Sequence, residues 1–111
     1  MSAEYEDFLK IDIRVGTIVE VEKFPQARTP AFKVFVDFGK KIGIKKSSAQ
    51  LTENYDESSL MGLQVAAVVN FPPKQIGPLM SEFLILGFPD KDGNVVLVMP
   101  EKSIPNGGAL Y

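Results

Sequence analysis

Apolar and polar residues alternate along the first half of the chain with the period of two that is typical of half-buried β-strands. The first run extends from Ile11 to Glu22, the second from Phe32 to Phe38, and the third from Ile42 to about Ser48. The short link at residues 39–41 predicts a hairpin between the second and third strands. Gly16 inside the first run indicates a bend or a bulge there, unless it is an incidental glycine.

The second half of the chain changes character before it returns to strands. Residues 49–63 are polar and fit a helical turn or a short helix. Strands are predicted at 64–70 and 81–88, separated by a proline-rich loop at 72–78 that regular pairing does not tolerate. Asp92 and Gly93, followed by Asn94, predict a tight hairpin turn before a further strand at 95–99.

This order of elements predicts an all-β fold. Three strands, a short helix and two more strands follow one another in the OB-fold, a five-stranded Greek-key barrel with its helix between strands three and four. We expect the barrel at about residues 11–88, with the last strand and both ends of the chain as added segments. No linker, repeat or low-complexity segment interrupts the sequence, so one domain is expected over residues 1–111.

The composition argues against an enzyme. Apolar residues make up 45% of the 111 residues and charged residues 23%, which are ordinary values for a folded domain. The chain contains neither histidine nor cysteine, which excludes nucleophilic triads and ordinary zinc sites. A carboxylate pair or a lysine nucleophile stays open, although no Asp or Glu has a recognisable catalytic spacing. We therefore predict a binding protein without a cofactor.

The sequence also bears on the compartment. No basic stretch followed by an apolar run stands at the amino terminus, and no apolar segment approaches the roughly 20 residues that a membrane-spanning helix needs. The absence of cysteine fits a reducing environment. We expect a cytoplasmic protein without membrane insertion.

The charges are unevenly distributed although the net charge is only −2. Residues 23–46 contain seven Lys or Arg and one acid. In an OB-fold the second and third strands form the usual face for oligonucleotides, so Lys33, Lys41, Lys45 and Lys46 are candidate phosphate contacts. A solvated lysine-rich edge that prevents aggregation between strands explains the same charges equally well.

Two phenylalanines are candidate peptide contacts. Phe35 shares a strand face with Lys33 and Asp37, opposite the apolar face of the same strand, so its ring can be exposed. Phe71 stands beside Pro72 and two further loop residues, Pro73 and Lys74, in a stiff loop that could border a cleft. A ring covered by a loop, or a loop that only ends a strand, is the alternative in each case.

Several segments together resemble the tRNA-binding domain family, and within it the CsaA branch of small bacterial and archaeal export chaperones. They are DIRVGTIVEVEKFPQAR, VDFGKKIGIKKSSAQL, VVNFPPKQIG, SEFLILG and IPNGG. The resemblance implies an OB-fold core, a homodimer formed through the terminal segments, and relatives that bind tRNA. It also implies a chaperone role toward unfolded segments or preproteins, with the export machinery as a further partner.

The sequence departs from the tRNA-binding pattern of this family at two loops. Relatives carry His-Pro followed by Ala-Asp-Lys where this chain has residues 24–28 (FPQAR), and Asn-Leu-Lys-Pro-Ala-Lys where it has residues 70–75 (NFPPKQ). A glycine of the family is Phe83 here. These changes replace basic or polar groups by apolar ones and favour a peptide over a nucleic acid.

Two functions are therefore predicted, and they share one barrel. The first is an ATP-independent chaperone, because no glycine-rich nucleotide loop is present. The alternative is a tRNA-binding protein that recognises RNA shape, and it differs from the first in a steep dependence on salt. The peptide-binding candidates are Phe35, Phe71, Pro73 and Phe83; the RNA-binding candidates are Lys33, Lys41, Lys45, Lys46, Asn70, Lys74 and Ser81.

Overall fold

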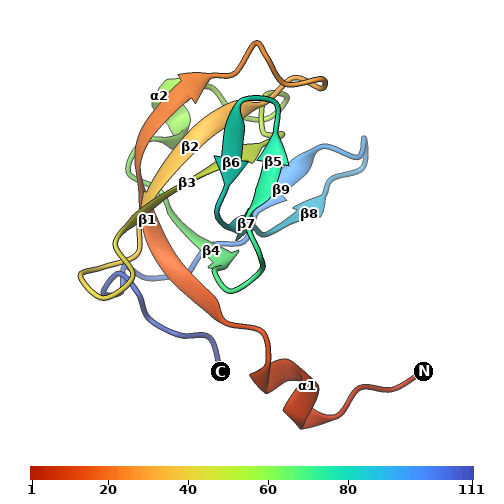
Figure 1. Cartoon of the computed structure of the whole chain (residues 1–111), viewed down its shortest axis with the longest axis vertical. Helices are drawn as coiled ribbons and strands as arrows, with labels where there is room; N and C mark the ends of the chain where they lie inside the picture. Colours follow the sequence, from red (N-terminus) through yellow and green to blue (C-terminus); the bar gives the residue numbers. More distant parts are fainter.

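A computed structural model describes all residues from 1 to 111 and confirms the predicted barrel (Figure 1). Five antiparallel strands form the main sheet in the order β3-β2-β1-β4-β7. They are β1 Ile13–Lys23, β2 Phe32–Asp37, β3 Ile44–Ala49, β4 Gln64–Val68 and β7 Leu84–Ile85. The sheet curls until β3 approaches the chain just before β7, which makes it a nearly closed OB-like barrel.

Backbone and side-chain hydrogen bonds join β3 to residues 81–83, and we call this line of contact the seam. The backbone N–H of Glu82 donates to the Lys46 carbonyl at 2.9 Å, and the Lys46 N–H donates to the Glu82 carboxylate at 3.0 Å. The buried Ser47 hydroxyl donates to the Phe83 carbonyl at 2.7 Å and lies 2.5 Å from the hydroxyl of Ser81. A buried hydroxyl is costly unless it is hydrogen-bonded, so Ser81 has a structural partner at this seam.

The alternation in the sequence produces the core. The inward residues of β2, Phe32, Val34 and Val36, are buried, as is Phe38 directly after the strand. Phe83 is only 5% exposed, and its ring meets that of Phe38 edge-to-face at 5.3 Å between centroids. The core of the barrel therefore covers most of the Phe83 ring, and its predicted contact with a peptide stays a prediction.

The proline-rich loop and the strand after it are more structured than expected. The loop contains a hairpin of β5 Lys74–Ile76 and β6 Leu79–Ser81. The single strand expected at residues 81–88 is divided into the end of β6, β7 and β8 Gly87–Pro89. The division follows from the seam, where Glu82 bonds to β3 while Phe83 turns its ring into the core.

The tight turn before the last strand is confirmed. β8 pairs with β9 Val95–Leu97 around residues 90–94. The Asp90 carboxylate accepts hydrogen bonds from the Asn54 amide and from the backbone N–H groups of Asp92 and Asn94. These bonds stabilise the ionised form and lower the pKa of Asp90, with Asn54 as the largest cause.

The helix between strands three and four is a single turn, α2 Glu57–Leu60. Asp56 caps it, accepting the Ser59 N–H at 2.7 Å and the Ser58 hydroxyl at 2.8 Å. These hydrogen bonds, that from Ser59 first, lower the pKa of the Asp56 carboxyl. Neither helix could span a membrane, since α1 Tyr5–Leu9 has five residues and α2 has four.

The two ends of the chain behave differently. The helix α1 Tyr5–Leu9 stands away from the barrel and buries none of its residues (Figure 1). The carboxyl-terminal segment instead runs along β1: the Gly107 N–H donates to the Val15 carbonyl at 2.8 Å, and the Leu110 N–H donates to the Ile13 carbonyl at 2.9 Å. This segment is therefore part of the sheet edge rather than an addition outside a complete barrel.

Candidate functional site

A groove lies between the hairpin β5–β6, the edge of β3 and the turn that joins β1 to β2. It encloses about 560 Å³. We call it the hairpin groove. Its walls come from three parts of the sequence that the barrel brings together, and they consist of Gln26, Ala27, Arg28, Thr29, Ala31, Ser47, Ser48, Gln50, Lys74, Gln75, Ile76, Gly77, Ser81, Phe83 and Leu84.

The hairpin groove is polar and carries only positive charge. Arg28 and Lys74 are exposed and line it, whereas no carboxylate does. Leu84 supplies exposed apolar surface, and Ser48 and Gln50 supply hydrogen-bonding groups. Such a surface suits an elongated polymer with acceptor or acidic groups. Nowhere does the chain bring together three or more His, Cys, Asp or Glu side chains that could hold a metal ion.

A smaller notch of about 170 Å³ adjoins the hairpin groove. Phe71 and Pro72 form one side of it, and it shares Lys74, Ser81, Phe83 and Leu84 with the groove. Phe71 is 45% exposed, so the structure confirms its predicted exposure. Pro73 is exposed as well but lines neither depression. The Phe71 ring is therefore exposed apolar surface in the notch that adjoins the groove.

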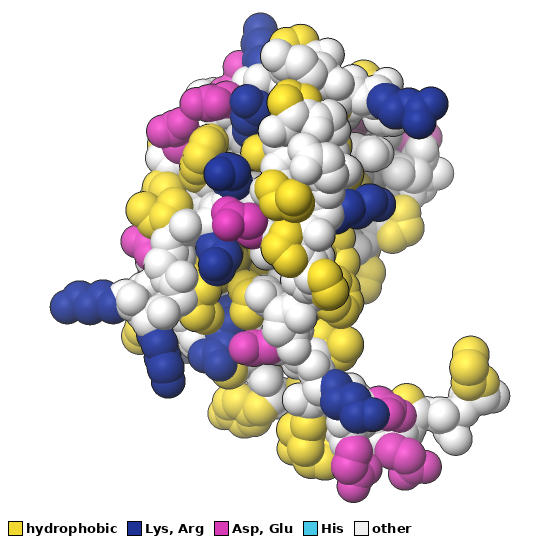
Figure 2. All heavy atoms as spheres, viewed as in Figure 1, with side chains coloured by type: hydrophobic (Ala, Val, Ile, Leu, Met, Phe, Trp, Pro, Cys, Tyr) yellow, Lys and Arg dark blue, Asp and Glu magenta, His cyan; other side chains and the backbone are white.

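The predicted lysine cluster is divided between faces of the barrel. Lys46 lies opposite Phe35 in the register of β2 and β3, whereas Lys45 lies opposite the buried Val36. Since neighbouring residues of a strand point to opposite faces, these two lysines do not share a surface. Lys41 lies in the exposed loop before β3. In Figure 2, basic side chains on the visible face are separated by acidic and apolar ones.

The outer face around Phe35 is also partly acidic. Phe35 is half-buried, and Glu20 of β1 lies beside it in the sheet register. A hydrogen bond that protonated Glu20 can make with Glu22, together with desolvation and the repulsion between the two carboxylates, raises the pKa of Glu20. The Lys33 ammonium lies over the Phe24 ring, 5.3 Å from its centroid. Two carboxylates beside Phe35 disfavour a phosphate backbone on this face.

Asn70 has a structural role that the sequence did not reveal. Its side-chain oxygen accepts the Asp12 N–H at 2.9 Å, and its side-chain nitrogen donates to the Lys10 carbonyl at 2.8 Å. Asn70 thus hydrogen-bonds the segment between α1 and β1 to the chain that follows β4. Of the predicted RNA contacts, Lys74 and Ser81 line the hairpin groove, and Ser81 is also engaged with Ser47.

Arg28, Gln50 and Leu84 line the groove but were not among the candidate site residues. The basic balance of residues 23–46 already contained Arg28 and was the one available signal for it. The sequence contains no such signal for Gln50 and Leu84, because only the closure of the barrel brings them to the hairpin.

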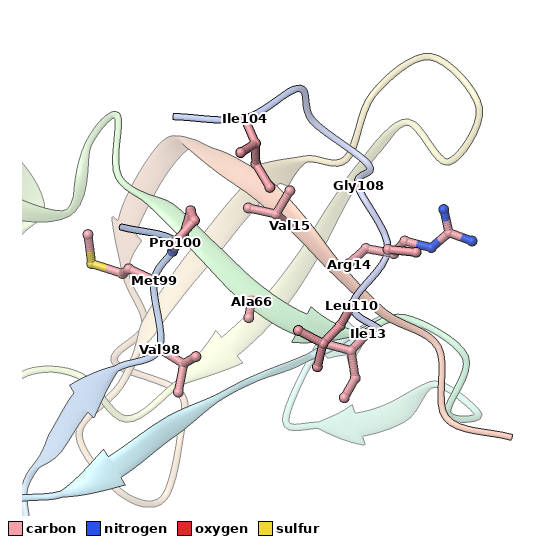
Figure 3. A pocket seen from close by; sticks show the side chains of 11 residues that line it. Ile13, Arg14, Val15, Ala66, Val98, Met99, Pro100, Ile104, Gly108 and Leu110 are labelled. Carbon is pink, nitrogen blue, oxygen red and sulfur yellow. The ribbon is translucent and has the colours of Figure 1, made fainter. Parts of the chain in front are cut away.

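A second surface lies at the two ends of the chain (Figure 3). An apolar cavity of about 160 Å³ is lined by residues of β1, by residues 98–100 and by the carboxyl-terminal segment. Ile104 points toward Val15 in this cavity, whereas the Arg14 side chain points away and donates to the Gly107 carbonyl at 2.9 Å. Exposed apolar side chains surround the cavity: Met99, Ile104 and Leu110. Leu9 of α1 lines a neighbouring depression together with Leu110, and we call the cavity with these exposed residues the terminal face.

The chain matches the family described as "Putative tRNA binding domain" over residues 13–109. Its fold is shared with the crystal structure of the chaperone CsaA of Bacillus anthracis, at 45% identity and a TM-score of 0.94, with 100% of both chains covered. The CsaA chaperone protein of Picrophilus torridus gives 48% identity and a TM-score of 0.93, covering 99% of this chain and 100% of that one.

A methionine–tRNA ligase of Porphyromonas gingivalis is 36% identical over 106 residues, which are 96% of this chain. The chain spans about 15% of the length of that ligase. The match to the family covers the whole barrel, and the likeness to the two chaperone structures extends from end to end. The chain therefore belongs to the tRNA-binding domain family and is a CsaA-type member of it.

Proposed function

We propose that this protein is an ATP-independent chaperone that holds extended or unfolded protein segments, including preproteins on their way to export. The observation that supports this proposal most directly is the exposed Phe71 ring in the notch that adjoins the hairpin groove. An apolar ring next to a polar groove offers an unfolded segment one anchor and a surface along which to lie. The likeness to two chaperones over their whole length favours the same activity.

The function consists of binding without a chemical step. Phe71 is followed by two prolines, which limit the conformations of its loop. A contact that is already in place loses little conformational entropy on binding. We place this activity in the cytoplasm and propose broad, modest affinity, with the export machinery as the receiver of the client.

We also propose that the protein is a homodimer through the terminal face. The helix α1 has five residues and buries none of them, and a helix this short is marginal in water by itself. Its Leu9 and the nearby Leu110 are 61% and 55% exposed. A second copy of the chain would cover these leucines and pack against α1. In a twofold symmetric interface each such contact occurs twice.

Replacing Phe71 by serine is expected to weaken binding of an unfolded client about tenfold, as for an interface contact worth roughly 1 to 2 kcal/mol. The melting temperature should stay within about 2 °C of the unchanged protein, because surface substitutions usually change stability by less than about 0.5 kcal/mol. Fluorescence anisotropy with a labelled, reduced and carboxymethylated protein measures the affinity, and calorimetry measures the stability.

The matched control is Phe88→Ser. Phe88 is 68% exposed, but it lies on β8 and lines neither the groove nor the notch. It should bind the client as the unchanged protein does. Equal losses at both positions would mean that the client recognises exposed apolar surface in general, and full binding by Phe71→Ser would reject the anchor.

A second function, tRNA binding, is favoured by the charge of the hairpin groove. Arg28 and Lys74 line the groove and no carboxylate does, although Glu82 lines the adjoining notch together with Lys74, and the chain is related to tRNA ligases. The groove is thus a better phosphate site than the outer face, where Glu20 and Glu22 lie near Lys33. RNA and protein clients would then compete for one groove.

If tRNA binds in the groove, the double variant Arg28→Ala with Lys74→Ala should reduce the slope of log affinity against log salt by roughly 0.7 to 0.9 per lost phosphate contact. Filter binding of unmodified tRNA over a salt series measures this slope. The matched control replaces Lys91 and Lys102, which line no part of the groove. If the slope falls only in a triple variant that replaces Lys41, Lys45 and Lys46 by alanine, the RNA contacts these lysines outside the groove instead.

A further inference from the structure

The strand β3 has one edge that the barrel does not use completely. In the ladder between β2 and β3, Ser47 lies opposite Val34 and Ala49 opposite Phe32. The Lys46 backbone points the other way, since its N–H and carbonyl bond to Glu82. Backbone groups alternate in direction along a strand, so those of Ser48 point away from β2 as well.

Ser48 finds no main-chain partner on that side. Its N–H takes part in no hydrogen bond outside the ladder, and its carbonyl lies 3.2 Å from the Ser47 hydroxyl, whose proton is directed to the closer Phe83 carbonyl at 2.7 Å. The seam with Glu82 ends at Lys46. Beyond it, Ser48 and then Gln50 border the hairpin groove. The unpaired N–H of Ser48 therefore lies at the border of the hairpin groove, where β6 also runs close to β3.

We infer that the hairpin groove receives an extended polypeptide as an added strand, hydrogen-bonded to the main chain of β3 at Ser48. This inference rests on the proposed chaperone function and specifies how the client is recognised. An extended polypeptide repeats a donor and an acceptor at every second residue with the spacing that an open edge offers, which RNA does not.

Recognition through the main chain explains how one groove can serve many clients. The protein would hydrogen-bond to the backbone amides and carbonyls of the added strand, whose side chains would point alternately to either side. Exposed Leu84 offers an apolar contact, and Arg28 and Lys74 favour an acidic residue. Phe71 would meet the segment where it leaves the groove through the notch.

The Ser48→Pro variant tests this inference inside the protein. Proline removes the N–H that an added strand would use, and it is tolerated at a strand edge where the N–H does not belong to the ladder. We expect an eight-residue peptide of alternating valine and glutamate, blocked at both ends, to bind this variant about tenfold more weakly. Ser48→Ala keeps the backbone donor and loses only the hydroxyl, so Ser48→Pro should bind the peptide clearly more weakly than Ser48→Ala does.

Modified peptides test the same inference without altering the protein. One peptide is N-methylated at every valine and another at every glutamate, which removes main-chain donors without changing charge. At least one of them should bind the unchanged protein roughly tenfold more weakly, as expected when one or two main-chain hydrogen bonds are lost. This measurement decides the question even if Ser48→Pro fails to fold.

The outcomes separate the inference from the function on which it rests. If both methylated peptides bind as tightly as the unmodified one, the inference that the client binds as an added strand is wrong, whereas the proposed chaperone function is unaffected. If neither the peptide nor an unfolded protein binds at all, the proposed function fails together with the inference. If folded Ser48→Pro keeps its peptide affinity but loses affinity for a single-stranded RNA, the groove belongs to RNA and the inference is overturned.

Discussion

Replacing Gly16 by alanine is expected to lower the free energy of unfolding by about 3 kcal/mol, the upper end of the cost of overpacking a core. A Cβ atom at this position would lie 2.5 Å from Val36 Cγ1, 2.7 Å from Phe38 Cδ1 and 2.9 Å from the Asp37 carbonyl oxygen. Two of these neighbours belong to the buried core, and the third is backbone. Urea denaturation should show the loss as a lower midpoint with an unchanged slope.

Gly108→Ala is the matched control. The nearest atom to a Cβ there is the Pro105 carbonyl oxygen at 3.4 Å, an ordinary contact. Its stability should therefore stay within about 0.5 kcal/mol of the unchanged protein. Equal stability of both variants would show that β1 and β2 can separate without cost, which would contradict the close packing of the barrel at this crossing.

Replacing Leu9 and Leu110 together by lysine is expected to raise the dissociation constant of the proposed dimer at least about 1,000-fold, or roughly 4 kcal/mol. A twofold interface buries each leucine twice, and a fully buried leucine contributes about 1.5 to 3 kcal/mol. Like charges brought together at the same place add repulsion. Sedimentation equilibrium over a range of concentrations measures the change.

The control for the dimer is Ile44→Lys, an exposed apolar residue at the start of β3, outside the terminal face. It should leave the dimer intact. An unchanged protein that remains a monomer at micromolar concentration would reject the dimer, as would equal dimer affinity in both variants. Deleting residues 104–111 is a poorer test, because that segment hydrogen-bonds to β1 and its loss would disturb the barrel itself.

The proposed binding site and the proposed dimer interface are connected by one residue. Asn70 fastens Lys10 and Asp12 through its side chain, and the next residue in the chain is Phe71. The loop that presents Phe71 is therefore held by the segment that leads to α1. Support of α1 by a second copy would hold this loop more firmly.

The sequence by itself determined the strands of the barrel and the turn between the last two. A period of two is a local property, because every second side chain of a strand points to one face. The alternation at residues 32–38 therefore predicted both β2 and its buried face, and the Asp92-Gly93 turn predicted the β8–β9 hairpin. Phe71 was predicted to be exposed because the two prolines that follow it stiffen its loop.

Only the tertiary structure decided which of the candidate residues share a surface. Lys45 and Lys46 are neighbours in sequence, but the ladder directs them to opposite faces. The bulge in β1 lies between Ile18 and Glu20 rather than at Gly16, whose role is close packing against β2. Phe83 entered the core because barrel closure placed it against Phe38.

The hairpin groove itself depends on contacts between residues far apart in sequence. Arg28, Ser48 and Lys74 meet only when the β1–β2 turn, β3 and the β5–β6 hairpin come together at the seam. The carboxyl-terminal segment likewise joins the sheet through bonds between Val15 and residues 107 and 108. Alternation and turn signals report which face a residue takes, but the partners across a barrel are set by closure, which depends on the packing of the whole core.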